Sequence, residues 1–308
     1  MKHLGLALLP GVIAWLAIAA VLHTSWVKRL WDHPNERSLH SVPTPRIGGI
    51  GILAGTLALA ILQPVGALAA ILGCAFLLWC VGLVDDLRSL PVRVRLSAHG
   101  LAAFAAMWAV SGPPGDPASA LPWFVAVVAI TWGANLFNFM DGADGLAGGM
   151  SALGFAFYAV AAASAQESML ASTALVLASA SAGFLLHNFP PARAFLGDSG
   201  SIPLGFLAGA LGAYGVACGA WPWVFPVLVF SPFIVDATVT LLHRIVRGEA
   251  FLRAHRTHYY QRLVLAGWSH RRLAVCAYGL MLAAGASALV LRSEGPLLQC
   301  GIILGWSA

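Results

Sequence analysis

The chain has 308 residues, of which 59% are hydrophobic and only 9% are charged, and its mean hydropathy is +0.83. Because soluble domains average about 25% charged residues, this composition excludes an ordinary soluble enzyme. It indicates a single integral membrane domain spanning residues 1–308. The net charge of +5 suits a membrane face that attracts anionic lipid headgroups. No nucleic-acid-binding motif accompanies the basic residues, so nucleic acid is not an expected partner.

Long apolar segments predict an all-α, polytopic helical bundle with about 10 or 11 transmembrane helices. The segments are continuously apolar instead of alternating, which argues against strands. Several are shorter than the ~20 residues that span a bilayer, and the last is the weakest. In chain order they are residues 4–22, 47–62, 65–84, 96–110, 121–137, 146–163, 169–186, 202–217, 224–242, 273–291 and 296–306.

The basic residues predict the orientation of this bundle, because cytoplasmic loops carry an excess of Lys and Arg. If the N-terminus lies outside and the helices alternate, all 17 basic residues except Lys2 and Arg292 fall in cytoplasmic loops. The same topology places every polar cluster described below on the cytoplasmic side. We therefore expect an active-site cleft that faces the cytoplasm.

The polar stretch at the end of the fifth segment is the strongest functional signal. Asn135 and Asn138 lie three residues apart, on one face of a helix. Asp141 and Asp144 follow in a glycine-rich turn, where capping and turn formation explain Asp144 and in part Asp141. Capping does not explain two amides on one face of an apolar helix. We interpret the stretch as functional.

Two further acidic motifs flank apolar segments. Asp85 and Asp86 end the third segment and point in different directions, so that one can face a cation and the other a substrate. A solvated helix end is the alternative, although two negative charges there oppose the helix dipole. Asp198 precedes the eighth segment, whose start offers N–H groups for a phosphate. Capping explains the Asp198 motif equally well.

A basic cluster lies in the longest predicted cytoplasmic loop and contains His255, Arg256 and His258. Arginine binds phosphate oxygens bidentately and histidine can shuttle protons, whereas a loop that only touches lipid headgroups is the alternative. Asp236 lies inside an apolar segment and needs a partner, either for structure or for catalysis. Carboxylates for Mg²⁺ beside Arg and His for phosphate suggest phosphoryl transfer from a cytoplasmic nucleotide to a lipid.

In their order along the chain, these motifs resemble those of the polyprenyl-phosphate N-acetylhexosamine-1-phosphate transferases, the glycosyltransferase 4 family. The resemblance covers nearly the whole chain, from Arg37 to about Trp268, and includes residues 38–49 as the first cytoplasmic loop. The motifs that carry it are Asp85-Asp86, Asn135-x-x-Asn138-Phe-Met-Asp141-Gly-x-Asp144-Gly-Leu-Ala, Phe195-Leu-Gly-Asp198-Ser-Gly-Ser and His255-Arg-Thr-His258.

The resemblance implies a reaction in the bacterial inner membrane. A polyprenyl phosphate such as undecaprenyl phosphate attacks the sugar-bearing phosphate of a UDP-N-acetylhexosamine, and UMP leaves. The metal would be Mg²⁺, with Mn²⁺ as a substitute. Asp198 would bind it, with Asn138 contributing to the same site. Asp144 would lie near the uracil, and Asn135 and Asp141 would complete this substrate site.

The remaining roles also follow from the resemblance. Asp85 would be the base or orienting group for the lipid phosphate, with Asp86 as its partner. The diphosphate would be contacted by His255, Arg256 and His258. A homodimer is compatible with these expectations.

Two departures from the family pattern narrow the prediction. Ten positions after Asp85 some relatives have a lysine, whereas this chain has Arg95, which could grip a phosphate or anchor its helix. The peptidoglycan-precursor branch has consecutive histidines where residues 255–261 read His-Arg-Thr-His-Tyr-Tyr-Gln. This favours the branch that starts O-antigen and other surface polysaccharides, as in lipopolysaccharide biosynthesis. Phospho-N-acetylmuramoyl-pentapeptide transfer, an intramembrane prenyltransferase and a membrane transporter for lipids or ions remain the alternatives.

Overall fold

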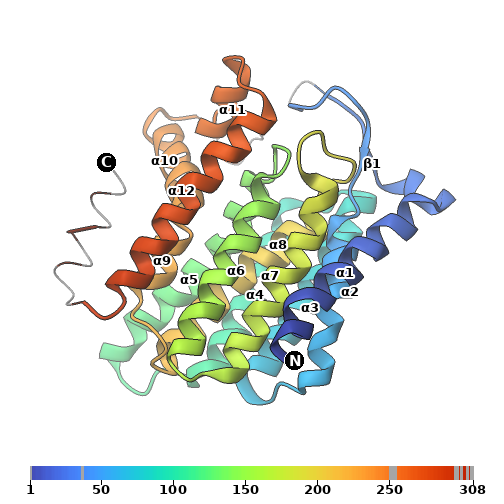
Figure 1. Cartoon of the computed structure of the whole chain (residues 1–308). Coiled ribbons are helices and arrows are strands. Elements are labelled where there is room, and N and C mark those ends of the chain that lie inside the picture. The colour runs from blue at the N-terminus through green and yellow to red at the C-terminus, as the bar shows by residue number, and fades with distance from the viewer. Residues whose placement is uncertain are drawn as a thin grey trace.

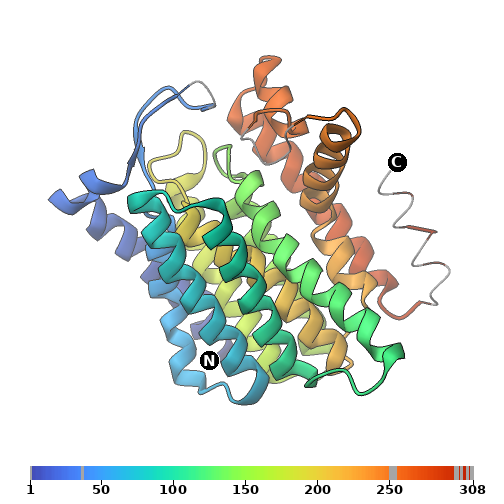
Figure 2. The same ribbon diagram turned by 180° about the vertical axis from the view of Figure 1, so that it is seen from behind.

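The computed structural model describes residues 2–35, 38–249, 255–294, 298, 301–302 and 305. Helices make up almost all of it, and they run side by side in a bundle (Figure 1; Figure 2, from behind). The α-helices are α1 (Lys2–Leu22), α2 (Gly48–Thr56), α3 (Gly66–Arg88), α4 (Val92–Ser111), α5 (Pro117–Met140), α6 (Leu146–Ser164), α7 (Ser168–Asn188), α8 (Asp198–Ala217), α9 (Val224–Val229), α10 (Ser231–Val246), α11 (Tyr259–Leu265) and α12 (His270–Leu291). Two 3₁₀ helices, η1 (Ser25–Leu30) and η2 (Leu57–Leu62), and a short hairpin of β1 (Trp31–Asp32) and β2 (Thr44–Pro45) complete the described elements.

The prediction of an all-α, polytopic membrane bundle is confirmed. Within the described residues, six helices are long and apolar enough to cross a membrane, namely α3, α5, α6, α7, α8 and α12. The other predicted segments up to residue 291 correspond to α1, α2 with η2, α4, and α9 with α10. The predicted segment 296–306 falls largely outside the described residues.

Two local features differ from the sequence-based expectation. Residues 224–242 are not one helix, because α9 ends at Val229 and α10 begins at Ser231. Pro232 lies in the first turn of α10, where a missing N–H costs nothing, but it would interrupt a continuous helix. The seven-residue α11 was not predicted, since seven residues carry too little hydrophobic periodicity to stand out.

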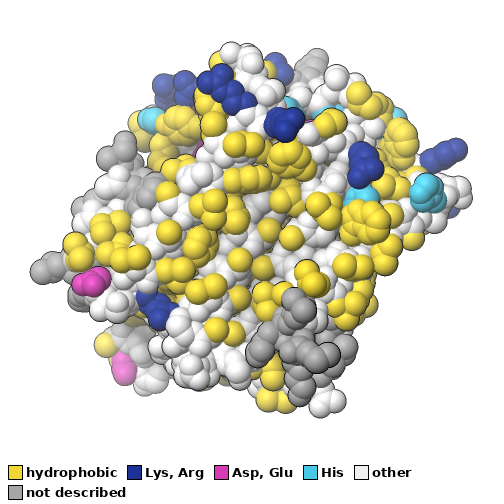
Figure 3. Space-filling model, viewed as in Figure 1, with side chains coloured by type: hydrophobic (Ala, Val, Ile, Leu, Met, Phe, Trp, Pro, Cys, Tyr) yellow, Lys and Arg dark blue, Asp and Glu magenta, His cyan; other side chains and the backbone are white. Residues whose placement is uncertain are grey.

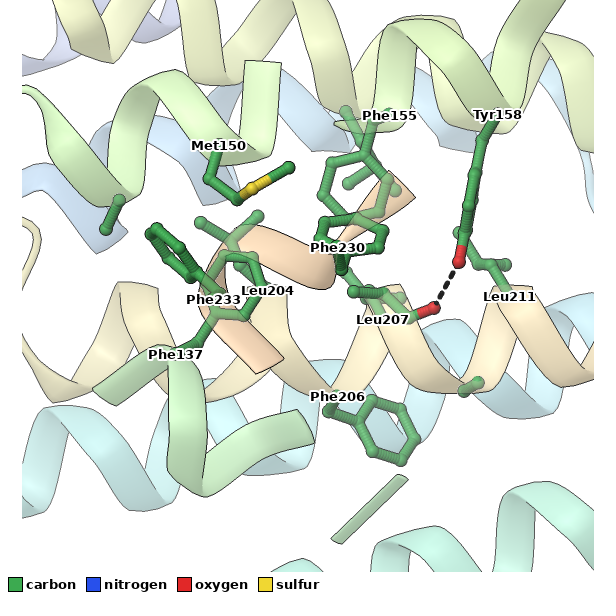
Figure 4. Close-up of a cluster of buried hydrophobic side chains, with 14 of the residues drawn as sticks. Phe137, Met150, Phe155, Tyr158, Leu204, Phe206, Leu207, Leu211, Phe230 and Phe233 are labelled. Atoms are coloured by element: carbon green, nitrogen blue, oxygen red, sulfur yellow. Dashed lines mark hydrogen bonds between the residues drawn. The ribbon is translucent and has the colours of Figure 1, made fainter. Parts of the chain in front are cut away.

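Helix α8 forms the centre of the bundle, with α3 and α5 as its main neighbours and α2, α4, α6 and α9 also in contact. Figure 4 shows the apolar cluster around its middle, where Leu204 and Leu207 lie among aromatic rings from α5, α6 and the α9–α10 junction. Tyr158 of α6 donates its hydroxyl to the backbone carbonyl of Ala208 at 2.9 Å. The position of the first residue of α8 is therefore fixed from several sides.

Glycines allow α5 and α8 to approach each other closely, as small residues do at membrane helix interfaces. A Cβ atom added to Gly133 of α5 would lie 2.8 Å from the carbonyl oxygen of Gly205 of α8. A Cβ added to Gly205 would overlap the carbonyl oxygen of Gly133. Gly133 precedes Asn138 in α5, and Gly205 follows Asp198 in α8. The close contact of the two glycines therefore helps to set the distance between Asn138 and Asp198.

The loops at one end of the bundle gather around the start of α8. Phe195 donates its backbone N–H to Pro45 O at 2.8 Å, and its carbonyl accepts from Ile47 and Gly48. The hairpin and α11 lie at this end, whereas the N-terminus lies at the other (Figure 1). Most Lys and Arg side chains on the face in Figure 3 also lie at the end with α11 and β1.

We predict that Gly205→Ala destabilises the protein, because the added methyl group must push α5 and α8 apart. The expected loss is about 1–3 kcal/mol, seen as a lower midpoint of thermal unfolding in detergent. Gly279→Ala in α12 is the matched control, since a Cβ there meets no atom within 4 Å. The control should be as stable as the wild type or slightly more stable. Equal stability of Gly205→Ala and the wild type would contradict the close approach.

Candidate active site

A polar cavity of about 300 Å³ opens at the end of the bundle where the loops gather. Its walls come from the first loop, the end of α5 with the turn that follows, the segment before α8, and the starts of α11 and α12. Of the residues predicted from sequence, those that line the cavity are Asn138, Asp141, Asp144 and Asp198.

Two carboxylates from different helices converge beside this cavity. Asp85 near the end of α3 and Asp198 at the start of α8 both accept a hydrogen bond from Nη1 of Arg95, at 2.9 and 3.2 Å. The backbone N–H of Leu90 also donates to Asp85, which holds this carboxylate in one orientation. The structure thus brings together three predicted residues that are up to 113 positions apart, since α3, α4 and α8 pack against one another.

The two predicted amides have different surroundings. Asn138 donates through Nδ2 to Asp198 Oδ1 at 2.7 Å and lies 3.2 Å from the hydroxyl oxygen of Ser201. Asn135, one turn deeper, donates to the carbonyl of Thr131 in its own helix at 2.7 Å and does not line the cavity. Of the two amides, only Asn138 therefore reaches Asp198.

Asp86 caps the buried start of α8. Its Oδ1 accepts from the N–H of Asp198 at 2.9 Å, and its Oδ2 accepts from the N–H of Ser199 at 3.0 Å. Gly197, with φ of +74°, turns the chain beside this carboxylate, and a Cβ there would come within 2.8 Å of Asp86 Oδ2. The sequence suggested that these N–H groups bind a phosphate, but in the structure both are occupied by Asp86. The capping carboxylate comes from a neighbouring helix instead of the loop itself.

Asp141 and Asp144 line the cavity in different environments. Burial, together with the negative charges of Asp198 and Asp86, raises the pKa of Asp141 well above its usual range. Asp144 Oδ2 accepts from the N–H of Ala192 at 3.0 Å, and its Oδ1 lies 3.1 Å from Nδ1 of His270. Asp144 therefore ties the turn after α5 to the loop before α8 and to the start of α12.

Sequence reasoning missed several residues of the cavity wall. Arg46 donates to Asp32 Oδ1 at 2.6 Å, and its guanidinium remains about one-third exposed. Burial alone would lower the pKa of Arg46, but Asp32, Asp86 and Asp198 together raise it, so the residue stays charged. Arg46 lies in the segment 38–49 that resembles the family loop, whereas Asp32 had no sequence signal. Asn188, Gln261 and His270 also line the cavity without having been predicted.

The His/Arg cluster lies outside the cavity lining. Arg256 is exposed, and burial, with help from Arg244 and His258, lowers the pKa of His255 to about 4. His258 is buried, and its Nδ1 lies 3.1 Å from Asp236 Oδ1. Of this part of the chain, it is Gln261 in α11 that reaches the cavity wall.

The donor atoms suit a divalent cation that keeps part of its shell for other ligands. No group of three His, Cys, Asp or Glu side chains forms a complete metal cluster within the described residues. Asp85 Oδ2 and Asp198 Oδ2 nevertheless converge on one cationic nitrogen, with Asn138 beside them. Mg²⁺ commonly takes one or two carboxylates and completes its octahedron with water and substrate phosphates. The two carboxylate oxygens therefore fit Mg²⁺, whereas Asn138 directs Nδ2 at Asp198 and would have to present Oδ1 to serve as a ligand.

We predict that Asp86→Ala lowers the thermal stability of the protein, because two buried N–H groups of α8 lose their acceptor. The expected cost is about 2 kcal/mol, at the upper end for a helix cap. Asp116→Ala is the control, since Asp116 caps α5 at an exposed position by accepting from Ser119 N at 2.8 Å. Unfolding midpoints measured for both variants should show the larger loss for Asp86→Ala, and the reverse order would contradict the capping role.

The sequence of the chain matches a known protein family. A model described as "Glycosyl transferase family 4" matches residues 68–216. The chain is 31% identical over 287 residues to a Bacillus subtilis protein named "Probable undecaprenyl-phosphate N-acetylglucosaminyl 1-phosphate transferase", covering 88% of this chain and 80% of the relative.

Two further relatives cover most of the chain. The "Decaprenyl-phosphate N-acetylglucosaminephosphotransferase" of Mycobacterium leprae is 27% identical, over 88% of this chain and 80% of the relative. A "Phospho-N-acetylmuramoyl-pentapeptide-transferase" of Synechococcus sp. (strain RCC307) is 30% identical, over 92% and 87%. The chain therefore belongs to glycosyl transferase family 4, the polyprenyl-phosphate N-acetylhexosamine-1-phosphate transferases.

Proposed function

We propose that this protein transfers N-acetylhexosamine-1-phosphate from a UDP-sugar to a polyprenyl phosphate, undecaprenyl phosphate in the first instance, and releases UMP. The observation that carries the proposal is the convergence of Asp85, Asp198 and Asn138 beside a polar cavity at the end of a membrane bundle. Such a site can meet a soluble nucleotide and a membrane-anchored acceptor together. The names of the bacterial relatives support the same acceptor class.

In this reaction an oxygen of the acceptor phosphate forms a bond to the sugar-bearing phosphorus of the donor. The bond from that phosphorus to the bridging oxygen breaks, and UMP leaves with the electron pair. A bound Mg²⁺ would neutralise the negative charge of the diphosphate. Asp198 and Asn138 would hold this ion, and Asp85 would orient the acceptor phosphate. The hydrogen bonds that Leu90 and Arg95 donate to Asp85 prevent its carboxylate from turning away.

The remaining cavity wall suits the donor. The cavity volume of about 300 Å³ lies at the lower end of the range for small-molecule pockets. Arg46 presents a partly exposed guanidinium, which can bind phosphate oxygens bidentately. Asp144 and His270 line another part of the wall, where we place the nucleoside. Asn188 lies in the same wall, but its amide already bonds Gly145 N and Ala194 O. We assign the diphosphate to the side of Arg46 and Asp198.

The bundle supports a location in the bacterial inner membrane. The protein is a multi-pass membrane protein with bacterial relatives. We propose that the cavity faces the cytoplasm and that the N-terminus is periplasmic. Basic side chains gather at the cavity end of the molecule (Figure 3), as expected of a cytoplasmic face.

Within the family we propose the branch that starts O-antigen or other surface polysaccharides. The support is the sequence of residues 255–261, which lacks a run of consecutive histidines. Transfer of phospho-N-acetylmuramoyl-pentapeptide is the second candidate, because a relative with that name covers most of the chain. A panel of UDP-sugars that includes UDP-N-acetylmuramoyl-pentapeptide separates the two candidates.

The test is UMP release by purified protein in detergent with undecaprenyl phosphate, Mg²⁺ or Mn²⁺, and the donor panel. We expect release that requires lipid, metal and one donor. Asp198→Asn should lower kcat at least about 100-fold, because a group that stabilises the transition state loses its charge. The control is Asp116→Asn, an exposed carboxylate at the start of α5, which should keep full activity.

Wild-type turnover by Asp198→Asn would remove Asp198 from the metal site. If the folded wild-type protein releases no UMP with any donor, the proposed reaction fails and a transport function becomes the better explanation.

A further inference from the structure

Arg95 places a positive charge at the point where two carboxylates of the candidate metal site converge. Its Nη1 lies 2.9 Å from Asp85 Oδ2 and 3.2 Å from Asp198 Oδ2, so that one nitrogen atom bridges both side chains. Asn138 donates to the other oxygen of Asp198 at 2.7 Å. Both oxygens of Asp198 thus already accept hydrogen bonds from side-chain N–H groups. A metal ion that binds Asp198 has to compete with one of these donors.

The two carboxylates need a positive charge between them whether or not a metal ion is bound. Because both contact one nitrogen atom, Asp85 and Asp198 lie close together, and like charges at such a distance repel each other. The side chain of Asp85 is only 5% exposed, so water screens it poorly. Removing the positive partner of buried charges is strongly destabilising. Either the guanidinium or a metal ion therefore has to neutralise this pair.

The contact between Arg95 and Asp198 can open without a movement of the helices. Arg95 lies near the start of α4, and its side chain is 30% exposed. A guanidinium carries five N–H donors at the end of a long side chain, so it can release Asp198 and keep its bond to Asp85. Asp85 also accepts from Leu90 N, which holds its carboxylate in place while Arg95 moves. The ion pair with Asp198 is therefore the part of this cluster that can be exchanged.

A second arginine near Asp198 is engaged elsewhere. Arg46 donates to Asp32 Oδ1 at 2.6 Å, and within the described residues no hydrogen bond joins Arg46 to Asp198. Asp198 acts on Arg46 through its charge alone, and more weakly than Asp32 does. Of the two arginines, Arg95 is therefore the one that covers an oxygen of the metal-site carboxylate.

We propose that Arg95 neutralises the metal site when no cation is bound, and that a divalent cation enters by displacing it from Asp198. This inference rests on the proposed function, because it uses the same metal site. After the exchange Asp198 Oδ2 is a metal ligand, while Arg95 keeps its hydrogen bond to Asp85. The affinity for the cation is then the outcome of a competition between metal and guanidinium, and the two carboxylates are never left without a positive partner.

Binding of Mn²⁺, which takes the same oxygen ligands as Mg²⁺, tests the competition without any substrate. The full-length protein in detergent is titrated, and the free ion is measured by its electron paramagnetic resonance signal. Arg95→Gln should lower the Kd for Mn²⁺ about 3- to 10-fold, because the site no longer has to open before the ion binds. An unchanged or higher Kd in Arg95→Gln would overturn the proposal.

Arg93→Gln is the matched control for the loss of one positive charge. Arg93 lies two residues before Arg95 in the same helix, and its side chain is exposed. Because salt and water screen an exposed charge, this variant should change the Kd for Mn²⁺ by less than about 2-fold. An equal gain in affinity in both variants would show a general effect of charge and would overturn the displacement of Arg95 from Asp198.

Thermal unfolding gives a second readout that is independent of activity. In EDTA, Arg95→Gln should unfold at a lower temperature than the wild type, because Asp85 and Asp198 then repel each other without a positive partner. Saturating Mn²⁺ should make this difference smaller, since the ion takes over the neutralisation and stabilises the folded state that binds it. The same difference in EDTA and in Mn²⁺ would mean that Arg95 only anchors its helix, and would overturn the proposal.

Failure of this inference and failure of the proposed function give different results. Tighter Mn²⁺ binding by Arg95→Gln, with no UMP release by the folded wild type, would support the displacement and overturn the transfer reaction. Metal-dependent UMP release, with Mn²⁺ binding unaffected by Arg95→Gln, would support the reaction and overturn the displacement. No Mn²⁺ binding by the folded wild type would overturn both.

Discussion

The start of α8 inside the bundle is the constraint on which the site depends. The first N–H groups of a helix have no partner within the helix, and burial against neighbouring segments makes an unpaired N–H group costly. Asp86 of α3 accepts from two of these groups, which fixes α3 against α8. Its neighbour Asp85 then meets Asp198 and Arg95. The capping of α8 by Asp86 thus also positions Asp85 and Asp198, to which we assign roles in the reaction.

Carboxylates accept hydrogen bonds from the backbone of another segment at two further places in the structure. Asp236 of α10 accepts from the first N–H groups of α11, and Asp144 accepts from Ala192 N in the loop before α8. In each case a carboxylate from one segment satisfies the backbone of another. Charged groups are costly in a membrane unless they are paired or hydrogen-bonded, and these contacts meet that requirement. The active site is therefore assembled from segments that are joined through their acidic residues.

The apolar part of the molecule gives the site its rigidity. Aromatic side chains from α5, α6 and the α9–α10 junction pack around the middle of α8 (Figure 4). The glycine contact between α5 and α8 sets the distance between Asn138 and Asp198. Such close-packed interiors hold polar groups at fixed separations, which is what a reaction that relies on positioning needs.

The sequence by itself determined the membrane class, nearly all the helical segments, and the residue types of the site. These depend on hydropathy and on local spacing, which the chain carries everywhere. Only the tertiary structure decided which carboxylate lies beside Asp198 and which one caps a helix. Asp85 and Asp86 are adjacent in sequence, yet one faces Asp198 and the other caps α8, because successive helix residues point in different directions. The places of Asp32 and His270 in the cavity wall, and the contact of Asp236 with His258, were also recognised only in the tertiary structure. Contacts between distant segments leave no local signal in the sequence.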